Sequence, residues 1–247
     1  MALVFDKPST RTRVSFETGV FELGGHPLIL REGELQLARG ESARDTALVL
    51  ERMVHAIGIR TGSHETVEEL ARWSSVPVVN MLTHEHHPCQ ALADLMTLLE
   101  RFGTLGGLRL AYVGDGNNMA RSLLLAGAIA GVDVAVATPP ELSLPEAPGI
   151  DPAEAVRGAH AIYTDVWVSM GDEQDAERRR ALLAPYRVDA ELLAQARDDA
   201  IVLHCLPAHP GEEITAELLY GERSAVWDQA ENRLHAQKAL LEMLLAR

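Results

Sequence analysis

Aromatic side chains are scarce in this sequence: they make up 4% of its 247 residues, while hydrophobic residues as a whole make up 47%. The core must therefore be built from aliphatic side chains, which suits an α/β protein better than a β-sandwich. Cysteine is scarce as well, with only Cys89 and Cys205. Because no secretory leader pattern accompanies them, we expect two reduced thiols in a cytoplasmic protein.

Basic residues are outnumbered, with 22 Lys and Arg against 36 Asp and Glu, which gives a formal net charge of −14. Nucleic acids and anionic membranes are bound through Lys and Arg, so neither is an expected partner. No apolar run approaches the length of a membrane span. An anionic ligand would therefore have to be held by a local cluster of basic groups.

What the sequence does contain is a repeated alternation of short apolar segments and segments of helical periodicity, which restarts after Gly106 and Gly107. This pattern predicts an α/β fold of two domains, each a parallel-sheet core flanked by helices. Helices are expected at 12–25, 42–53, 66–74, 87–103, 117–131 and 230–245. Strands are expected at 2–5, 27–31, 56–60, 76–82, 108–115, 132–138, from 161, at 200–207 and at 224–229.

One connection in this pattern is short. Between the strand at 132–138 and the next strand near His160, residues 139–150 contain four prolines, and only the stretch 151–158 is a candidate helix. Parallel neighbours need a crossover, which is usually a helix. We therefore expect a segment to be missing around 139–155, and a helix to be missing before the first strand.

The stretch FDKPSTRTRVSFETG, residues 5 to 19, places hydroxyl and guanidinium groups just before a helical pattern. Backbone N–H groups at a helix start carry partial positive charge. Ser9, Thr10 and Thr12 add hydroxyl donors, and Arg11 adds a planar fork suited to phosphate. The pattern predicts an anion cradle; an ordinary Ser or Thr cap with solvated arginines is the alternative.

The stretch THEHHPCQ invites a metal interpretation. Its potential ligands are His84, His86, His87 and Cys89. Their spacing is irregular, and a fourth ligand would have to come from His64 or His204, so we do not predict a metal site. We prefer a neutral His87 that donates a hydrogen bond to a carbonyl oxygen, with a helix-capping histidine as the alternative.

Two further strand ends carry candidate groups. In VGDGNNMA, Gly114 and Gly116 fit the start of a dinucleotide fingerprint, but Met119 replaces its third glycine and the next strand ends without an acid. A nicotinamide cofactor is therefore not expected. In HCLP, Cys205 is either a nucleophile or a small buried residue, and the Leu206-Pro207 bond suits the cis form.

The motifs FDKPSTRTRVSFE, HPCQALAD, GDGNNMARS, YTDVWVSMG, HCLPAH and DQAENRLH, in this order over nearly the whole chain, resemble those of the aspartate/ornithine carbamoyltransferase family. The pair S-M-G and H-C-L-P is similar to the ornithine branch in particular. The resemblance implies transfer of the carbamoyl group of carbamoyl phosphate to the δ-amine of L-ornithine, giving L-citrulline and phosphate. It implies neither a metal nor an organic cofactor.

The resemblance also implies residue roles. Carbamoyl phosphate would be held by Ser9, Thr10, Arg11, Thr12, Gln36, Arg60, His87, Gln90, Cys205, Leu206 and Arg233, and ornithine by Asn118, Asp165, Ser169 and Met170. Arg60, His87, Cys205 and Asp165 would be catalytic. Arg60 and His87 would stabilise negative charge on the carbamoyl oxygen, and Cys205 with Asp165 would orient or deprotonate the amine. Closure of the loop 169–180 would exclude water.

At the level of domains, the resemblance implies a carbamoyl-phosphate domain at 1–105, an ornithine domain at 106–230, and a helix at 231–247 that returns to the first domain. Gln36 would reach carbamoyl phosphate across a subunit boundary, in a homotrimer or a higher assembly of trimers. One alternative is a carbamoyltransferase for putrescine or an N-acylated ornithine. Another is a non-catalytic regulatory subunit, which would be expected to lack Arg60, His87 or Cys205.

Overall fold

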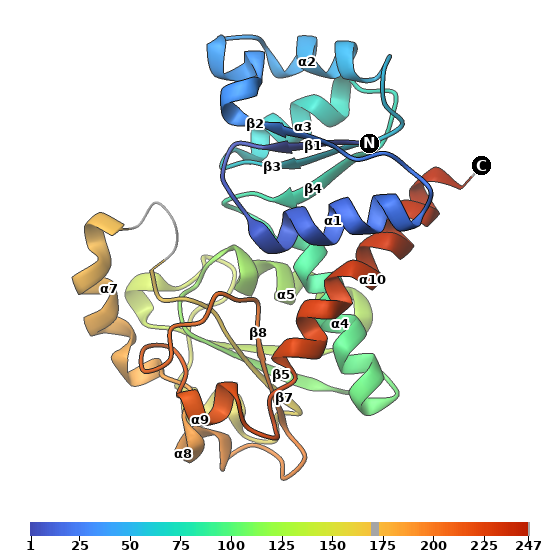
Figure 1. The fold of residues 1–247 in the computed structure, drawn as a ribbon. Coiled ribbons are helices and arrows are strands. Elements are labelled where there is room, and N and C mark those ends of the chain that lie inside the picture. The colour runs from blue at the N-terminus through green and yellow to red at the C-terminus, as the bar shows by residue number, and fades with distance from the viewer. Residues whose placement is uncertain (169–172, 247) are drawn as a thin grey trace. The chain divides into compact units, whose positions relative to one another are not determined.

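The structure is a computed structural model that describes residues 1–168 and 173–246, and this part of the chain forms two four-stranded parallel sheets (Figure 1). The chain divides into two compact units: Met1–Leu92 with the residues from Arg233 onward, and Ala93–Asn232. The two boundaries fall within helices α4 (Pro88–Phe102) and α10 (Val226–Leu245). The predicted α/β fold with two parallel-sheet cores is confirmed.

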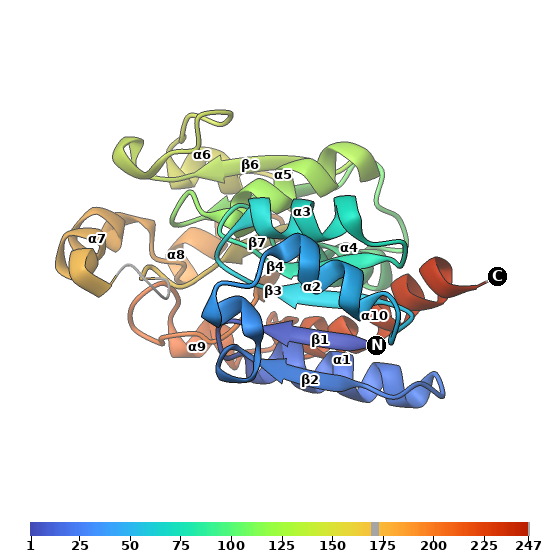
Figure 2. The same ribbon diagram turned by 90° about the horizontal axis from the view of Figure 1, so that it is seen from above.

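The sheet of the first unit has the strand order β2-β1-β3-β4, and the four strands lie side by side in Figure 2. Its strands are β1 (Ala2–Phe5), β2 (Leu28–Arg31), β3 (Ile57–Arg60) and β4 (Val78–Leu82). Every residue of the two central strands, β1 and β3, is buried. This is why β1 and the first three residues of β3 form continuous apolar runs and do not alternate with polar residues.

Helices cover both faces of this sheet. They are α1 (Thr10–Glu22), α2 (Ala43–Leu50) and α3 (His64–Trp73), together with the parts of α4 and α10 that belong to the unit. Side chains alternate along a strand. Ala2 and Val4 of β1 therefore pack with α2 and α3, while Leu3 and Phe5 pack with α1. Figure 1 shows α2 and α3 on one side of this sheet and α1 on the other.

The sheet of the second unit has the order β6-β5-β7-β8. Its strands are β5 (Arg109–Val113), β6 (Asp133–Ala137), β7 (Ala161–Thr164) and β8 (Ile201–His204). The helices are α5 (Asn118–Ala130), α6 (Pro152–Val156), α7 (Ala176–Leu183), α8 (Ala190–Leu193) and α9 (Ala216–Leu219). One aliphatic core joins this sheet to α6, α8 and α9.

The connection from β6 to β7 closes without a long helix. The connection joins two strands that are not neighbours in the sheet, because β5 lies between β6 and β7. The segment carries a 3-10 turn (Pro140–Leu142) and the short α6, and the Gly116 N–H donates to the Leu142 carbonyl oxygen at 3.1 Å. A Cβ at Gly116 would lie 2.2 Å from that oxygen, so the connection packs directly on the loop after β5.

One predicted strand is wrong. In 224–229 only Ser224 forms a bridge, to Val202, and the helix α10 already begins at Val226. The Gln229 side chain accepts from the His204 N–H at 2.9 Å, so a helical residue satisfies the end of β8. A short apolar run cannot by itself separate a strand from the first turn of a helix. The helices α8 and α9 are four residues each and leave no periodicity to predict.

Among the described residues, no helix is both long enough and apolar enough to cross a bilayer. Cys89 and Cys205 are both free thiols, as predicted. The Leu206-Pro207 peptide bond is cis, the form that the sequence suits.

Candidate active site

Polar side chains gather where the parallel strands of each sheet end. In the first unit, the chain runs from β1 to β2 on one side of β1, and then from β2 to β3 on its other side. Such a switch in strand order opens a crevice at the carboxyl ends of the strands, where ligands of α/β proteins bind. Residues 9–12 follow β1, and Arg60 is the last residue of β3.

Thr12 is the centre of the arginine cluster in the first unit. Its buried Oγ1 accepts hydrogen bonds from Arg233 Nη2 at 2.8 Å and from Arg60 Nη1 at 3.4 Å. Arg233 Nη1 in turn donates to Gln90 Oε1 at 3.0 Å. Side chains from α1, β3, α4 and α10 therefore meet within one buried network, although Thr12 and Arg233 are far apart in the sequence.

His87 lies beside this cluster, directly before α4. Its carbonyl oxygen accepts from the N–H groups of Gln90 and Ala91, so the residue caps the helix through its backbone. Burial, followed by the nearby guanidinium groups of Arg233, Arg60 and Arg11, holds the pKa of its imidazole well below the usual value. The ring is therefore neutral at neutral pH. His87 therefore caps the helix and carries a neutral imidazole, while its donation to a carbonyl oxygen stays a prediction.

The motif S-T-R-T forms the start of α1. Ser9 is the N-cap, and its Oγ accepts from the Thr12 N–H at 3.4 Å. The first turn of this 13-residue helix carries no acidic residue. Thr10 is exposed and Arg11 is half-buried, so both can be reached from solvent. The partial positive charge at the helix start adds to the positive charges of Arg11, Arg60 and Arg233. Gln36 is exposed and begins a 3-10 helix (Gln36–Arg39) elsewhere in the same unit.

Asp165 is the centre of the candidate site in the second unit, at the switch between β5 and β7. Its Oδ1 accepts from Cys205 Sγ at 2.9 Å and from the Val166 N–H at 2.8 Å. Its Oδ2 accepts from Asn117 Nδ2 at 2.8 Å. The three strand ends of β5, β7 and β8 therefore converge on one carboxylate.

The Cys205 thiol is a hydrogen-bond donor in this arrangement. Burial raises the pKa of the thiol well above its usual value, and the carboxylate of Asp165 raises it further. A nucleophilic cysteine needs the opposite, a lowered pKa. The geometry thus favours an orienting role for Cys205 over a covalent one.

A buried pair behind Cys205 fixes the HCLP turn. The Leu206 N–H donates to His204 Nδ1 at 2.8 Å, so the ring proton is on Nε2, which lies 3.2 Å from Glu213 Oε1. Both side chains of this pair are fully buried. The turn that they hold has Leu206 at a φ of 58°, in the left-handed region that non-glycine residues seldom adopt.

Several of the contacts at this site were not predicted from the sequence. Asn117 and Asn118 are both candidate amide groups for a polar ligand, and it is Asn117 that caps α5 and contacts Asp165. Asn118, the ornithine ligand that the resemblance implies, is the half-buried first residue of α5. Arg179 on α7 donates to Asp115 Oδ2 at 2.8 Å. Two adjacent asparagines and a run of arginines give no sequence signal for which member makes the contact. The predicted ligands Ser169 and Met170, and the start of the predicted closing loop, lie outside the described residues.

Gly116, one of the two glycines that suggested a dinucleotide fingerprint, has a structural role. The backbone of Leu142 approaches it too closely for any side chain. Cys89, one of the potential metal ligands in THEHHPCQ, packs in the core of the first unit and donates to the Asn80 carbonyl oxygen at 3.3 Å. Burial raises the pKa of its thiol to about 12, so Cys89 serves packing.

These features define a class: a two-unit α/β protein with basic, hydroxyl and amide groups at the carboxyl ends of one parallel sheet and a carboxylate and thiol at those of the other. Comparison with known proteins gives the family. Residues 1–100 match the carbamoyl-P binding domain of aspartate/ornithine carbamoyltransferase, and residues 106–244 match the Asp/Orn binding domain. The chain belongs to the aspartate/ornithine carbamoyltransferase family.

Relatives named ornithine carbamoyltransferase align over the whole chain. The protein of Methanoculleus marisnigri is 56% identical, with 100% of this chain and 84% of the relative covered. A solved structure from Pyrococcus furiosus is 49% identical with a TM-score of 0.94, covering 99% of this chain and 83% of that one. One from Thermus thermophilus is 49% identical with a TM-score of 0.91, covering 99% and 85%.

The alignment with the M. marisnigri protein spans 259 positions, more than the 247 residues of this chain. The relative therefore has residues within the aligned region that have no counterpart here.

Proposed function

We propose that this chain is an ornithine carbamoyltransferase, which transfers the carbamoyl group of carbamoyl phosphate to the δ-amine of L-ornithine and releases L-citrulline and phosphate. The observation that carries the proposal is the buried network in which Thr12 accepts from both Arg60 and Arg233, beside Gln90 and a neutral His87. The names of the full-length relatives support the choice of reaction.

The residues of the first unit are proposed to hold carbamoyl phosphate, through a domain that corresponds to residues 1–105. The phosphate is bound by the start of α1, with N–H groups, the hydroxyls of Ser9, Thr10 and Thr12, and the Arg11 guanidinium. Arg60 and His87 donate to the carbamoyl carbonyl oxygen, and Gln90 accepts from the carbamoyl NH₂ group. Arg233 and Gln36 are also proposed to contact this substrate.

Attack of the amine on the carbamoyl carbon forms a tetrahedral intermediate with negative charge on the former carbonyl oxygen. Donors that already point to one place stabilise such charge without reorganisation. Arg60 suits this task because its guanidinium is held by Thr12. His87 suits it because a neutral imidazole can donate without adding a further full charge to those of the nearby arginines. Phosphate then leaves, and Arg11 and Arg233 balance its charge.

The residues of the second unit are proposed to hold ornithine, through a domain that corresponds to residues 106–230. Asp165 pairs with the α-ammonium group, and Asn118, Ser169 and Met170 contact the rest of the amino-acid group. The δ-amine must lose a proton before or during attack. The departing phosphate can take that proton, and the Cys205 thiol, held by Asp165 and next to Leu206, orients the amine.

We further propose that the enzyme works in the cytoplasm as a homotrimer or a larger assembly of trimers, in which Gln36 reaches the site of a neighbouring subunit. Residues 231–247 are proposed to complete the first domain. The network in the first unit supports the last point, since Arg233 donates to Thr12 and Gln90.

A steady-state comparison of amines tests the substrate. L-Ornithine, putrescine and N-acetylornithine are each supplied with carbamoyl phosphate, and the carbamoylated product is measured. The proposal predicts that ornithine gives the highest kcat/KM. N-Acetylornithine has no free α-ammonium group to pair with Asp165, and putrescine has no α-amino acid group. A higher kcat/KM for putrescine or N-acetylornithine would contradict the proposed substrate, while no product from any amine would contradict the reaction.

A further inference from the structure

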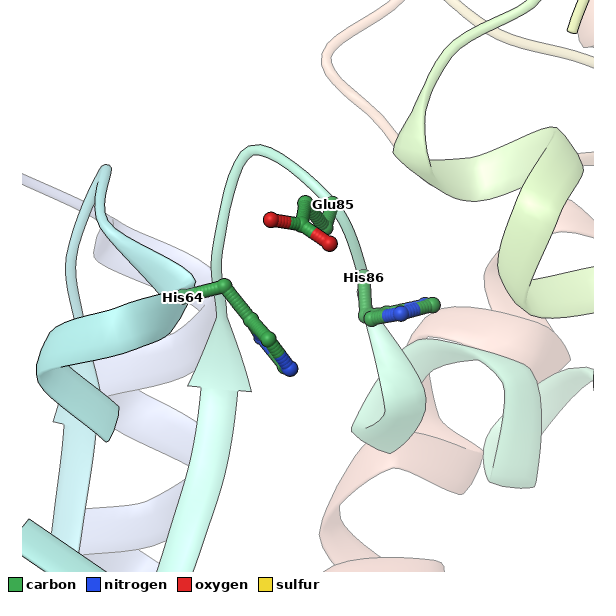
Figure 3. A group of neighbouring side chains, drawn as sticks. All are labelled: His64, Glu85 and His86. Atoms are coloured by element: carbon green, nitrogen blue, oxygen red, sulfur yellow. The ribbon is translucent and has the colours of Figure 1, made fainter. Parts of the chain in front are cut away.

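Three potential metal ligands that the proposed reaction does not use lie together in the first unit (Figure 3). His64 is the first residue of α3, and Glu85 and His86 lie on the loop between β4 and α4. One ligand atom from each residue lies within 4.8 Å of the others. The two imidazole rings meet edge to face, with centroids 5.1 Å apart and planes at 65°.

The Thr83 hydroxyl holds both sides of this cluster. Its Oγ1 lies 3.2 Å from His64 Nδ1 and accepts from the backbone N–H groups of Glu85 at 3.3 Å and His86 at 3.1 Å. The Thr83 N–H also donates to the His86 carbonyl oxygen at 2.8 Å. A hydrogen bond to one ring nitrogen of a histidine fixes the ring and leaves the other nitrogen for a metal.

We propose that His64, Glu85 and His86 bind one divalent transition-metal ion of the Zn²⁺ or Ni²⁺ type, with water completing its coordination. Two imidazoles and a carboxylate are a common ligand set for Zn²⁺, whereas Mg²⁺ and Ca²⁺ prefer oxygen ligands alone. Two neutral imidazoles and one carboxylate carry a single negative charge, and Glu68 Oε1 lies only 3.9 Å from His64 Nε2. The local charge thus favours a cation.

The cluster must contract slightly to take the ion. Bonds of 2.0–2.1 Å in a tetrahedral site put the ligand atoms about 3.4 Å apart, against a present limit of 4.8 Å. Glu85 is exposed and both histidines are half-buried, so side-chain rotation is sufficient. Because His86 directly precedes His87, a bound ion would also restrain the segment that leads into α4.

Two other groups of potential ligands occur in the described part of the chain: Asp165 with His204 and Cys205, and His209 with Glu212 and Glu213. The His204 ring already uses Nδ1 for the Leu206 N–H and Nε2 for Glu213. These groups therefore require side chains that the structure already uses to hold the HCLP turn. They serve as competing sites that the experiment must exclude.

Calorimetric titration of the untagged full-length protein with Zn²⁺ and Ni²⁺ tests the proposal. The background carries Cys205→Ser and His209→Ala, which remove a ligand from each competing group. We expect one equivalent to bind, and both His64→Ala and His86→Ala to weaken binding at least tenfold. His84→Ala is the matched control: His84 is an exposed histidine of the same loop, but its ring lies against Gly62, and we expect unchanged affinity.

A spectroscopic measurement separates coordination from a merely structural role of the histidines. Co²⁺ bound to two imidazoles and a carboxylate gives visible absorption bands, expected for the background protein and its His84→Ala form and absent from its His86→Ala form. Circular dichroism checks that each variant is folded. Equal affinity in all variants would overturn the proposal. So would binding by the unchanged protein that is lost once Cys205→Ser and His209→Ala are introduced, because the ion would then occupy a competing group. Binding of Mg²⁺ as tightly as Zn²⁺ would overturn it as well.

Discussion

At the residue scale, a single hydroxyl organises the arginine cluster of the first unit. Thr12 brings the guanidinium groups of Arg60 and Arg233 to one neutral oxygen, where their like charges repel each other. An anion bound beside them would relieve this repulsion, and the free energy gained would favour binding. The chain as a whole has a net charge of −14, so an anionic substrate requires a positively charged cluster such as this one.

The Cys205–Asp165 hydrogen bond leads to a prediction about thiol reactivity. Because burial and the Asp165 carboxylate raise the pKa of Cys205, little thiolate exists at neutral pH. Asp165→Asn removes the negative charge and lowers the pKa, and each unit of decrease raises the thiolate fraction tenfold. We expect alkylation of Cys205 by iodoacetamide at pH 7.5 to become roughly tenfold faster in Asp165→Asn, as measured by mass spectrometry.

Asp115→Asn is the control for this experiment, since the Asp115 carboxylate bonds to Arg179 and not to Cys205. Cys89, whose pKa is raised to about 12, is the internal reference for unfolding, because it becomes reactive only when the core opens. Equal or slower alkylation of Cys205 in Asp165→Asn would mean that the carboxylate does not set the state of the thiol.

The sequence predicted individual site residues only where the chemistry was dense. Hydroxyl and guanidinium groups at residues 9–12 stood out, because few other functions need them together. Arg233 was reached through a family resemblance alone, since nothing local marks one arginine of a long helix. The contacts of Glu213 with His204 and of Asn117 with Asp165 were missed because composition and periodicity do not reveal which side chains meet in the fold.

At the element scale, the buried strands were the most predictable part. Central strands of parallel sheets are covered on both faces, so β1 and β3 appear as short apolar runs with clear ends. The helices with serine or asparagine caps, such as α2 and α5, were also placed well. The short helices and the start of α10 were not, because their conformation depends on tertiary contacts such as that of Gln229 with β8.

The tight connection between β6 and β7 leads to a prediction about stability. A Cβ at Gly116 would lie 2.2 Å from the Leu142 carbonyl oxygen, which is backbone and cannot turn aside. Overpacking of this kind costs about 1–3 kcal/mol. Gly116→Ala should therefore lower the thermal unfolding midpoint, by roughly 2–4 °C for each kcal/mol in a chain of this size.

Gly106→Ala is the matched control for Gly116→Ala. A Cβ at Gly106 meets no atom within 4 Å, and its backbone is outside the left-handed region. We expect the unfolding midpoint of this variant to remain close to that of the unchanged protein. If both variants have the same unfolding midpoint as the unchanged protein, the connection is not packed on the loop after β5 as the structure describes.

At the scale of the whole molecule, the strand order places the chemistry. Each sheet has its first strand inside the sheet, which creates one switch in direction per unit. Arg60 and residues 9–12 lie at the first switch, and Asp165 and Asn117 lie at the second. The sequence predicted that polar groups sit at strand ends, but only the strand order shows which strand ends are neighbours.

The proposed trimer leads to a prediction about the activity of assemblies that contain two different variants. If Gln36 serves the site of a neighbouring subunit, Gln36→Ala and Arg11→Ala trimers are each poorly active, yet they complement each other after mixed refolding. A site in such hybrids works when Arg11 comes from one subunit and Gln36 from the next, so about one quarter of the sites should recover. Citrulline formation and the mass of the assembly are the readouts.

Refolding each variant separately is the control for the mixture. Activity in the mixture no higher than the mean of the two variants would show that Gln36 acts within its own subunit or not at all. A mass other than that of three chains, or of a multiple of three, would contradict the proposed trimer directly.

The central claim is that the arginine-rich strand ends of the first unit bind and activate carbamoyl phosphate. Citrulline formation by the unchanged protein and by Arg11→Ala tests it most directly. The account predicts that kcat/KM for carbamoyl phosphate falls by at least about 10²–10³-fold in Arg11→Ala, while circular dichroism and the unfolding midpoint stay unchanged. Unchanged turnover in a folded Arg11→Ala protein would contradict it.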